Sequence, residues 1–210
     1  MSTLPDRRSR KRLAMRQIIS DVASRLFVER GFDQVTIDDI AAAADVSRMT
    51  VFNHFPRKED MFFDLDELGR EDLHRAFEQF DKDGDLHPVE ALRLFVHRAV
   101  AERRPYTRFI PGSEKFVATV MASEALKARA RAIRGELTAT IAVALSVGTD
   151  SRVPDSSTNL AAALITATLA TAFLEGHRVF RVSRDGESAT ATFLAVIDQG
   201  WRGVAAAKDH

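Results

Sequence analysis

Apolar side chains recur at three- and four-residue intervals through almost the whole of this chain, and this spacing is typical of amphipathic helices. No run of strictly alternating apolar and polar residues is long enough to indicate a sheet. The 10 glycines and 6 prolines among 210 residues stand mostly between the periodic segments. The sequence therefore predicts an all-α fold of one or two domains with a sizeable core.

Composition excludes several classes of protein. The chain has no cysteine, so it has no disulfide framework, thiol nucleophile or cysteine-based zinc finger. Its basic start is not followed by the apolar run of a secretory signal peptide. The most apolar stretch, Leu160 to Leu174, has 15 residues, whereas a membrane span needs about 20. We expect a cytoplasmic protein that does not contact a membrane.

The 30 basic and 30 acidic residues cancel, but they are unevenly distributed. Residues 1–16 carry a net charge of +5, residues 17–45 a net −4 and residues 46–58 a net +3. Two basic clusters flanking an acidic segment are typical of a small nucleic-acid-binding module on a neutral carrier. A basic terminus is also typical of a solvated tail, so charge alone leaves both interpretations open.

Residues 36–55 predict two short helices joined by a tight turn, behind a supporting helix that ends at Gly31. Thr36 is a favourable residue at the start of the first short helix, and Ser47 at the start of the second. Asp45 lies between them and tolerates the left-handed backbone conformation of a turn better than most residues. The pattern predicts a helix-turn-helix.

The second short helix, from Arg48 to His54, has one side that does not pack against the predicted core. Its residues Arg48, Met49, Thr50 and Asn53 lie near the N-terminal end and away from the predicted core. A helix-turn-helix presents such side chains to base edges in the major groove of DNA. Arginine and asparagine are suited to bidentate contacts with guanine and adenine.

The segment from Thr36 to Met61, TIDDIAAAADVSRMTVFNHFPRKEDM, resembles the DNA-binding signature of the tetracycline-repressor (TetR) family, and the resemblance covers about residues 12–65. It implies a three-helix helix-turn-helix domain over residues 1–57, with a basic N-terminal tail. It also implies a larger helical domain over residues 58–210 that binds a small-molecule effector and dimerises. The implied function is a ligand-responsive transcriptional repressor whose homodimer binds a palindromic double-stranded DNA operator. We expect neither a metal nor a cofactor.

The resemblance assigns DNA contacts to a set of nine residues: Thr36, Ser47, Arg48, Met49, Thr50, Phe52, Asn53, His54 and Lys58. In this family pattern Thr36 and Ser47 are cap positions near phosphates. Positions 48, 49, 50 and 53 resemble the groove-lining set, and His54 and Lys58 resemble clamps on the DNA backbone.

Two positions depart from the family pattern. Asp45 stands where glycine is usual, which brings a negative charge near DNA. Phe52 stands where tyrosine is usual, which removes a phosphate-binding hydroxyl. We expect the arginine-rich tail to compensate by entering the minor groove or lying on the DNA backbone.

Further along the chain, the periodicity predicts one long helix from about Arg57 to Phe80 and a loop from Asp81 to Asp85. The loop is similar to a calcium loop, but its twelfth position is Leu92 instead of glutamate, which favours a plain polar turn.

The last two predicted helices carry an excess of apolar surface. Leu160 to Leu174 is apolar on every side and must be covered on two faces. The final helix, about Glu187 to Ala206, offers a matching stripe: Phe193, Ile197, Trp201 and Val204. We therefore predict a homodimer through these two helices, a shared four-helix bundle. The alternative is a central helix fully enclosed within a monomer.

Six residues are candidates for the lining of an effector site: Tyr106, Phe109, Phe116, Met121, Phe173 and His177. A packing role is equally open for each of them, and His177 fits the edge of a dimer as well as a pocket. An apolar effector is the expectation.

Two other classes of protein remain as alternatives. An enzyme is disfavoured because the six histidines are scattered, without a His-x-x-x-His pair, and because Gly-x-Ser-x-Gly and phosphate-binding glycine motifs are absent. A helical dimerisation module without a DNA function is disfavoured by the basic clusters at both ends of the helix-turn-helix.

Overall fold

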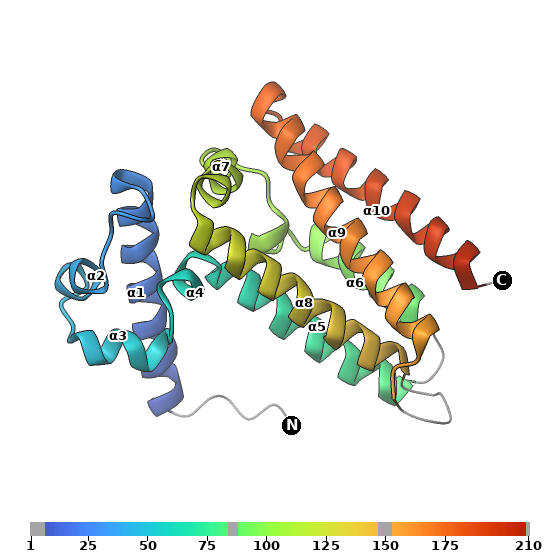
Figure 1. Cartoon of the computed structure of the whole chain (residues 1–210), viewed down its shortest axis with the longest axis horizontal. Coiled ribbons are helices and arrows are strands. Elements are labelled where there is room, and N and C mark those ends of the chain that lie inside the picture. The colour runs from blue at the N-terminus through green and yellow to red at the C-terminus, as the bar shows by residue number, and fades with distance from the viewer. Residues whose placement is uncertain (1–6, 84–87, 147–152, 209–210) are drawn as a thin grey trace.

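The structure is a computed structural model that describes residues 7–83, 88–146 and 153–208. The described residues form ten α-helices and one 3-10 turn, and this confirms the predicted all-α fold (Figure 1). The elements are α1 (Arg7–Arg30), α2 (Ile37–Ala43), α3 (Arg48–His54), α4 (Lys58–Phe62), α5 (Asp64–Asp83), α6 (Pro88–Ala101), η1 (Pro105–Thr107), α7 (Glu114–Ala122), α8 (Glu124–Ser146), α9 (Ser156–Ser183) and α10 (Gly186–Lys208).

Helices α1 to α3 form a compact unit at one end of the molecule, and the antiparallel pair α9 and α10 lies at the other (Figure 1). The N-terminal unit has its own core, which holds Phe27, Ile40, Val51 and Phe55. This core also includes Leu126 from the first turn of α8, which is fully buried. The N-terminal unit is therefore seated on α8 as well as joined to the rest of the chain through α4.

The local signals of the helix-turn-helix are confirmed. The Thr36 hydroxyl accepts a hydrogen bond from the Asp39 amide at 3.1 Å, and the Ser47 hydroxyl accepts one from the Thr50 amide at 3.0 Å. Asp45 has φ of 53° and Gly31 has φ of 85°, as their turn and cap positions require. Helix α3 runs over the predicted residues.

The basic N-terminal segment differs from the predicted tail. From Arg7 onward it is the start of α1, a single helix of 24 residues. Arginine, lysine, leucine, alanine and methionine have high helix propensity and dominate this segment, so the helix continues well beyond its buried part. The basic side chains are consequently held at helical spacing.

The predicted long helix from Arg57 is interrupted at Phe63, which separates α4 from α5. Two consecutive phenylalanines lie at the break, and the Phe116 ring meets both: its centroid is 4.9 Å from that of Phe62 and 5.7 Å from that of Phe63. Consecutive residues of a regular helix point about 100° apart. The interruption thus allows both rings to pack against one partner. Residues Asp81–Asp83, predicted as loop, are the end of α5, and residues 84–85 lie outside the described residues.

The apolar stripe of α10 predicted to match the helix at 160–174 is buried within this chain. Phe193, Ile197, Trp201 and Val204 belong to the C-terminal core together with residues of α6 and α9. The indole nitrogen of Trp201 donates a 2.8 Å hydrogen bond to the Val89 carbonyl, which ties α10 to α6. The stripe therefore belongs to the chain's own core, and the prediction of a homodimer through these two helices stays a prediction.

Helix α9 is only half enclosed, so it differs from the fully covered helix of a monomer. One face is buried between α8 and α10 and carries Ala162 and Ile165. The opposite face is exposed and carries apolar side chains at helical spacing, with Thr171 and Arg178 among them: Leu160, Leu164, Leu174 and Val182. By length and composition alone this 28-residue helix is long and apolar enough to cross a membrane. Core helices of globular proteins meet the same criterion, and the buried face of α9 is that of a core helix.

A close contact behind α9 provides a test of the packing. A Cβ at Gly176 would lie 2.3 Å from Cζ of the buried Phe109 ring, whereas a Cβ at Gly135 in α8 would meet nothing within 4 Å. We expect Gly176→Ala to lower the free energy of unfolding by about 1–3 kcal/mol through overpacking. Gly135→Ala, the matched control, should raise it by up to about 1 kcal/mol, because alanine has the higher helix propensity. Thermal unfolding followed by circular dichroism checks both, and equal shifts in the same direction would contradict the packing described.

Candidate nucleic-acid interface and effector cavity

Helix α3 has one buried face and one open face. Val51 and Phe55 are fully buried in the N-terminal core. On the other side, Arg48 and Asn53 are exposed, Met49 is 68% exposed and Phe52 is 39% exposed. A short helix with a bare face of this kind fits the major groove of DNA, which admits an α-helix.

The Arg48 side chain is held by its own chain, a feature that sequence reasoning missed. Its Nη1 donates to both carboxylate oxygens of Asp38 in α2, at 3.2 and 2.9 Å. Its guanidinium also lies 5.5 Å from the centre of the Phe52 ring. The Asp38 contact therefore competes with contacts that Nη1 of Arg48 would make to a base.

The cap hydroxyls are occupied by bonds within the chain. The Thr36 hydroxyl donates to Asp39 Oδ2 at 2.6 Å, and the oxygens of the Ser47 and Thr50 hydroxyls are 2.8 Å apart. The Thr36 amide donates to the same Asp39 carboxylate, and hydrogen bonds with Thr36 lower the pKa of Asp39. These residues shape the ends of α2 and α3.

Lys58 does not extend toward solvent as a clamp on DNA would. Its ammonium donates to the carbonyls of Phe32 and Val35, both at 2.9 Å, and lies 4.2 Å from the centre of the Phe32 ring. The lysine thus satisfies two carbonyls of the segment that joins α1 to α2. The place of Lys58 at the start of α4 agrees with the family resemblance, but the hydrogen bonds of its ammonium stabilise the chain's own fold.

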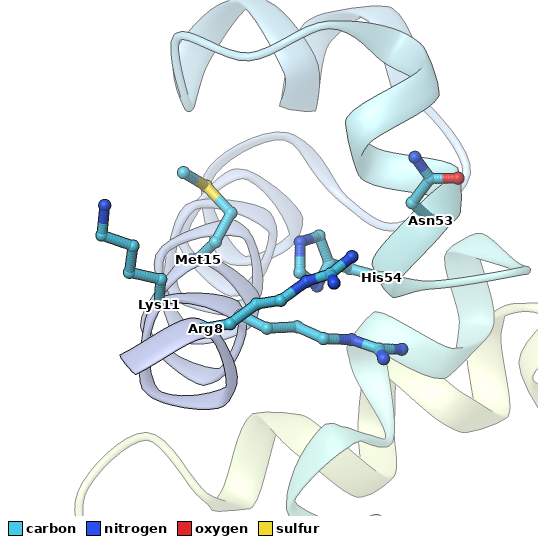
Figure 2. Close-up of a pocket in the computed structure, with 6 residues that line it drawn as sticks. Arg8, Lys11, Met15, Asn53 and His54 are labelled. Atoms are coloured by element: carbon cyan, nitrogen blue, oxygen red, sulfur yellow. The ribbon is translucent and has the colours of Figure 1, made fainter. Parts of the chain in front are cut away.

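A basic groove of about 490 Å³ lies between the start of α1 and the end of α3. Figure 2 shows Arg8, Lys11 and Met15 of α1 facing Asn53 and His54 of α3. Arg12 completes the lining. The basic groove of the protein adjoins the open face of α3 through Asn53. When α3 lies in the major groove of DNA, the phosphates of the neighbouring strand therefore lie beside these cations. The cluster of cations can be seen in the sequence, but its position beside α3 follows only from the helical conformation of α1.

Two arginines affect the protonation of His54. Burial lowers the pKa of His54, and the positive charges of Arg12 and Arg16 lower it further. The same shift favours the uncharged imidazole, so the positive charge of the groove comes mainly from the arginines and lysine of α1.

Arg16 connects the N-terminal unit to the rest of the chain. Its Nη1 donates to the His54 carbonyl at 2.8 Å, and its Nη2 pairs with Asp64 at the start of α5 at 2.6 Å. Its guanidinium lies 4.2 Å from the centre of the Phe55 ring. One side chain from α1 thus joins the end of α3 to the first turn of α5.

A second cavity, of about 410 Å³, lies among α5 to α10, and its wall is mostly apolar. Four of the six residues predicted for an effector site line it: Tyr106, Phe116, Met121 and Phe173. The rest of the wall comes from apolar residues such as Leu92, Val96 and Phe193, with three arginines, Arg70, Arg131 and Arg134. Sequence reasoning missed these arginines because two of them belong to the charged side of α8.

Phe109 and His177 lie behind the cavity wall instead of in it. His177 is buried one turn beyond Phe173, and the two rings are 4.4 Å apart. The Phe109 ring is 5.0 Å from that of His177 and occupies the space above Gly176. Because His177 is buried within its own chain, its side chain does not lie at the edge of a dimer.

The Tyr106 hydroxyl points away from the cavity interior to a carboxylate of α5. It donates to Asp72 at 2.7 Å, and Arg104 pairs with the same carboxylate. Burial and the Asp72 hydrogen bond raise the pKa of Tyr106 to about 12. Tyr106 therefore presents its ring and not an acidic group to a ligand. Within the described ranges, no group of three or more histidine, aspartate or glutamate side chains is placed to hold a metal ion.

Comparison with known sequences identifies the N-terminal unit. Residues 19–65 match the family model described as bacterial regulatory proteins, tetR family. The chain is 32% identical over 83 residues to the HTH-type transcriptional regulator AcrR of Shigella flexneri, covering 39% of each protein. It is 30% identical over 84 residues to the HTH-type transcriptional repressor DhaR of Mycobacterium sp. (strain GP1), covering 40% of this chain and 42% of that one. The matches thus span about two fifths of these curated relatives, which are named as regulators and not as enzymes.

Solved structures extend the likeness of the fold to nearly the whole chain. A structure described as a SmeT–triclosan complex has a TM-score of 0.56 and 19% identity, over 90% of this chain and 91% of that one. A putative TetR-family transcriptional regulator from Mesorhizobium loti has a TM-score of 0.51 and 16% identity, over 90% and 96%. The fold of an N-terminal helix-turn-helix followed by a helical domain is confirmed. Residues 19–65 are thus similar to the tetR family of bacterial regulatory proteins, and the fold of the chain is similar to that of these solved structures.

Proposed function

We propose that this protein is a cytoplasmic, ligand-responsive transcriptional repressor that binds a palindromic DNA operator as a homodimer and leaves it when a small molecule occupies the cavity. The observation that carries the proposal is the open face of α3, with Arg48 and Asn53 exposed beside the basic groove of α1. Base edges are recognised by such side chains in the major groove, while flanking cations hold the phosphates. The named relatives are transcriptional regulators and repressors, which supports this assignment.

Within this proposal, the DNA-contacting set is Arg48, Met49, Phe52, Asn53 and His54, with Thr36, Ser47 and Thr50 shaping the helix ends. The cations Arg8, Lys11 and Arg12 of α1 extend the contact along the DNA backbone. We leave Lys58 out of the direct contacts because its ammonium is bonded to two carbonyls.

The division between the DNA-binding domain and the effector domain is placed at about residue 57/58, at the start of α4. Helix α4 and the residue that follows it belong to both, because Met61 is buried in the N-terminal core while Phe63, which caps α4, also lines the cavity. The dimer interface is assigned to α9 and α10, with the exposed apolar face of α9 as its centre. Paired α9 faces would hold two α3 helices at a fixed separation, which half-site spacing requires.

Aromatic contacts provide a route for coupling the cavity to the DNA-binding unit. Phe116 lines the cavity and stacks on Phe62, whose ring lies 5.9 Å from Phe32 in the N-terminal core. On the cavity side, Phe116 lies 5.9 Å from Phe173 of α9. A ligand that displaces Phe116 therefore acts on packing shared with the DNA-binding unit. A coupling free energy of about 1–3 kcal/mol is typical of such regulation.

A gel shift tests the proposal directly. We expect a specific complex with duplex DNA from upstream of the protein's own gene, in the presence of excess non-specific competitor. Because phosphate contacts release counterions, its affinity should fall steeply between about 50 and 200 mM salt. A scrambled duplex of equal length is the control. The absence of a specific complex across such upstream duplexes, or an affinity independent of salt, would contradict the proposal.

Asp38→Asn is expected to tighten DNA binding. The substitution frees Arg48 and removes a negative charge from the side of α2 next to α3. An exposed ion pair is worth up to about 1 kcal/mol, so we expect up to about a fivefold gain in affinity per subunit. Fluorescence anisotropy of a labelled duplex measures it, with Glu102→Gln, at an exposed residue just after α6, as a charge-matched control. Weaker binding by Asp38→Asn would show that Asp38 positions Arg48 for DNA instead of competing with it.

A further inference from the structure

We propose that the ligand of the cavity among α5 to α10 is an amphipathic anion: an apolar body of about ten carbons that carries one carboxylate, with the carboxylate bound by Arg131 and Arg134. This inference rests on the proposed function, because it names the chemical class of the effector. Its evidence is the distribution of charge and burial around the cavity, which is independent of the DNA-binding face.

Apart from the half-buried Arg70, the deep part of the cavity offers a ligand almost no polar partner. Leu73, Leu92 and Val96 are buried there. The three hydroxyls of the wall are bonded elsewhere. Thr166 donates to the Ala162 carbonyl at 2.8 Å, Thr107 to the Arg104 carbonyl at 2.9 Å and Tyr106 to Asp72 at 2.7 Å. A polar group placed in this part would lose its hydrogen bonds to water without replacement. The interior therefore selects an apolar body.

The mouth of the cavity is marked by the lining residues that remain exposed. These are Met121 of α7, Arg131 and Arg134 of α8 and Leu174 of α9. The arginines are three residues apart on one helix, so their side chains leave the same face of α8. The mouth thus has an apolar rim and a pair of guanidinium groups.

The charge of the lining has one sign. All charged lining residues in the described ranges are arginines, and none is a carboxylate. Arg134 makes no ion pair with any residue that the structure describes. Arg131 lies near Glu124, but that carboxylate is ion-paired with Lys127 at 2.5 Å. Guanidinium groups bind carboxylates through paired, charge-assisted hydrogen bonds. An anionic group is therefore the complement of this mouth.

The volume limits the size of the ligand. A water molecule takes about 30 Å³ of liquid, so a cavity of about 410 Å³ holds roughly a dozen non-hydrogen atoms of similar size. Decanoate has this size and the required chemistry. Decanol and the decyltrimethylammonium ion share its apolar chain and differ in the charge of the head group, so the three form a matched set of probes.

The test is isothermal titration calorimetry of the full chain with decanoate, decanol and decyltrimethylammonium, each below its aggregation concentration. We expect decanoate to bind about tenfold more tightly than decanol, since hydrogen bonds to charged groups are the stronger ones. The cation should bind no more tightly than decanol. In the variant Arg131→Gln/Arg134→Gln the affinity for decanoate should fall to that of decanol, and the affinity for decanol should not change. Arg98→Gln, at an exposed arginine of α6 outside the cavity lining, is the control and should retain the preference.

Both substituted arginines are exposed, so the unliganded double variant should unfold at the same temperature as the original protein. The inference is overturned if decanoate does not bind, if decanol or the cation binds at least as tightly, or if the double variant keeps the preference for decanoate. Binding is measured without DNA. A protein that binds its operator but not decanoate would refute this inference alone, and one that binds decanoate but no DNA would refute the proposed function.

Discussion

The double variant Arg48→Ala/Asn53→Ala is expected to lose specific operator binding by a factor of about 1,000 or more. Each bidentate contact with a base is worth about 1–3 kcal/mol of discrimination, and a homodimer would make each contact twice. Even the lower value for four contacts gives about 4 kcal/mol, or about three orders of magnitude in affinity. Fluorescence anisotropy on the upstream duplex, with excess non-specific competitor, measures the loss.

The same variant should retain its fold, because both side chains lie on the exposed face of α3. Its melting temperature is therefore the internal control, and Arg98→Ala, at an exposed residue of α6, is the control for loss of one positive charge. Weak, salt-dependent binding to any duplex should persist through Arg8, Lys11 and Arg12. If the double variant bound the upstream duplex as tightly as the original protein, α3 would not be the helix that contacts the bases.

Leu164→Glu is expected to convert the protein to a monomer. Leu164 is 38% exposed in the single chain and lies within the apolar face of α9. In a symmetric dimer the substitution buries a carboxylate twice, at a cost of several kcal/mol for each charge. Operator affinity should then fall at least about 100-fold, because one subunit binds only one half-site. Sedimentation equilibrium measures the molecular mass, and anisotropy measures the affinity.

Val143→Glu is the matched control for this substitution. Val143 is an exposed apolar residue of α8 that does not belong to the apolar face of α9, so its variant should remain a dimer with unchanged operator affinity. A Leu164→Glu protein that sediments as a dimer would contradict the assigned interface. A wild-type chain that is monomeric at micromolar concentration would contradict the dimer itself.

The helix-turn-helix was predictable because its determinants are short-range. The caps at Thr36 and Ser47 and the turn at Asp45 each involve residues no more than three positions away, and α3 runs from Arg48 to His54 as predicted. Interactions between residues so close in the chain can be recognised from the sequence alone. The alternation of buried and exposed positions on α3 follows from the same local periodicity.

The features that the sequence did not reveal depend on contacts between distant segments. Phe116 lies some fifty residues from the Phe62–Phe63 pair that interrupts the predicted long helix. The ammonium of Lys58 donates to the carbonyls of Phe32 and Val35, and no local sequence pattern indicates these two hydrogen bonds.

The position of the α8 arginines is also a product of tertiary packing. Their spacing marks the charged side of a helix, and a charged side usually faces water. Arg131 and Arg134 reach the cavity mouth because α7 and α9 pack beside α8 and leave a space there. The same holds for the α10 stripe that includes Phe193 and Trp201. The sequence shows that the stripe is apolar, but only the packing of α6 and α9 shows that the same chain covers it.

Selection of duplexes from a random-sequence DNA pool by the purified full chain, followed by sequencing, most directly tests whether paired α3 helices recognise DNA. The account predicts enrichment of an inverted repeat whose half-site centres lie about one helical turn of DNA apart, or a multiple of it. It also predicts that the Arg48→Ala/Asn53→Ala protein enriches no such repeat. Enrichment of no sequence, or of a single site without two-fold symmetry, would contradict it.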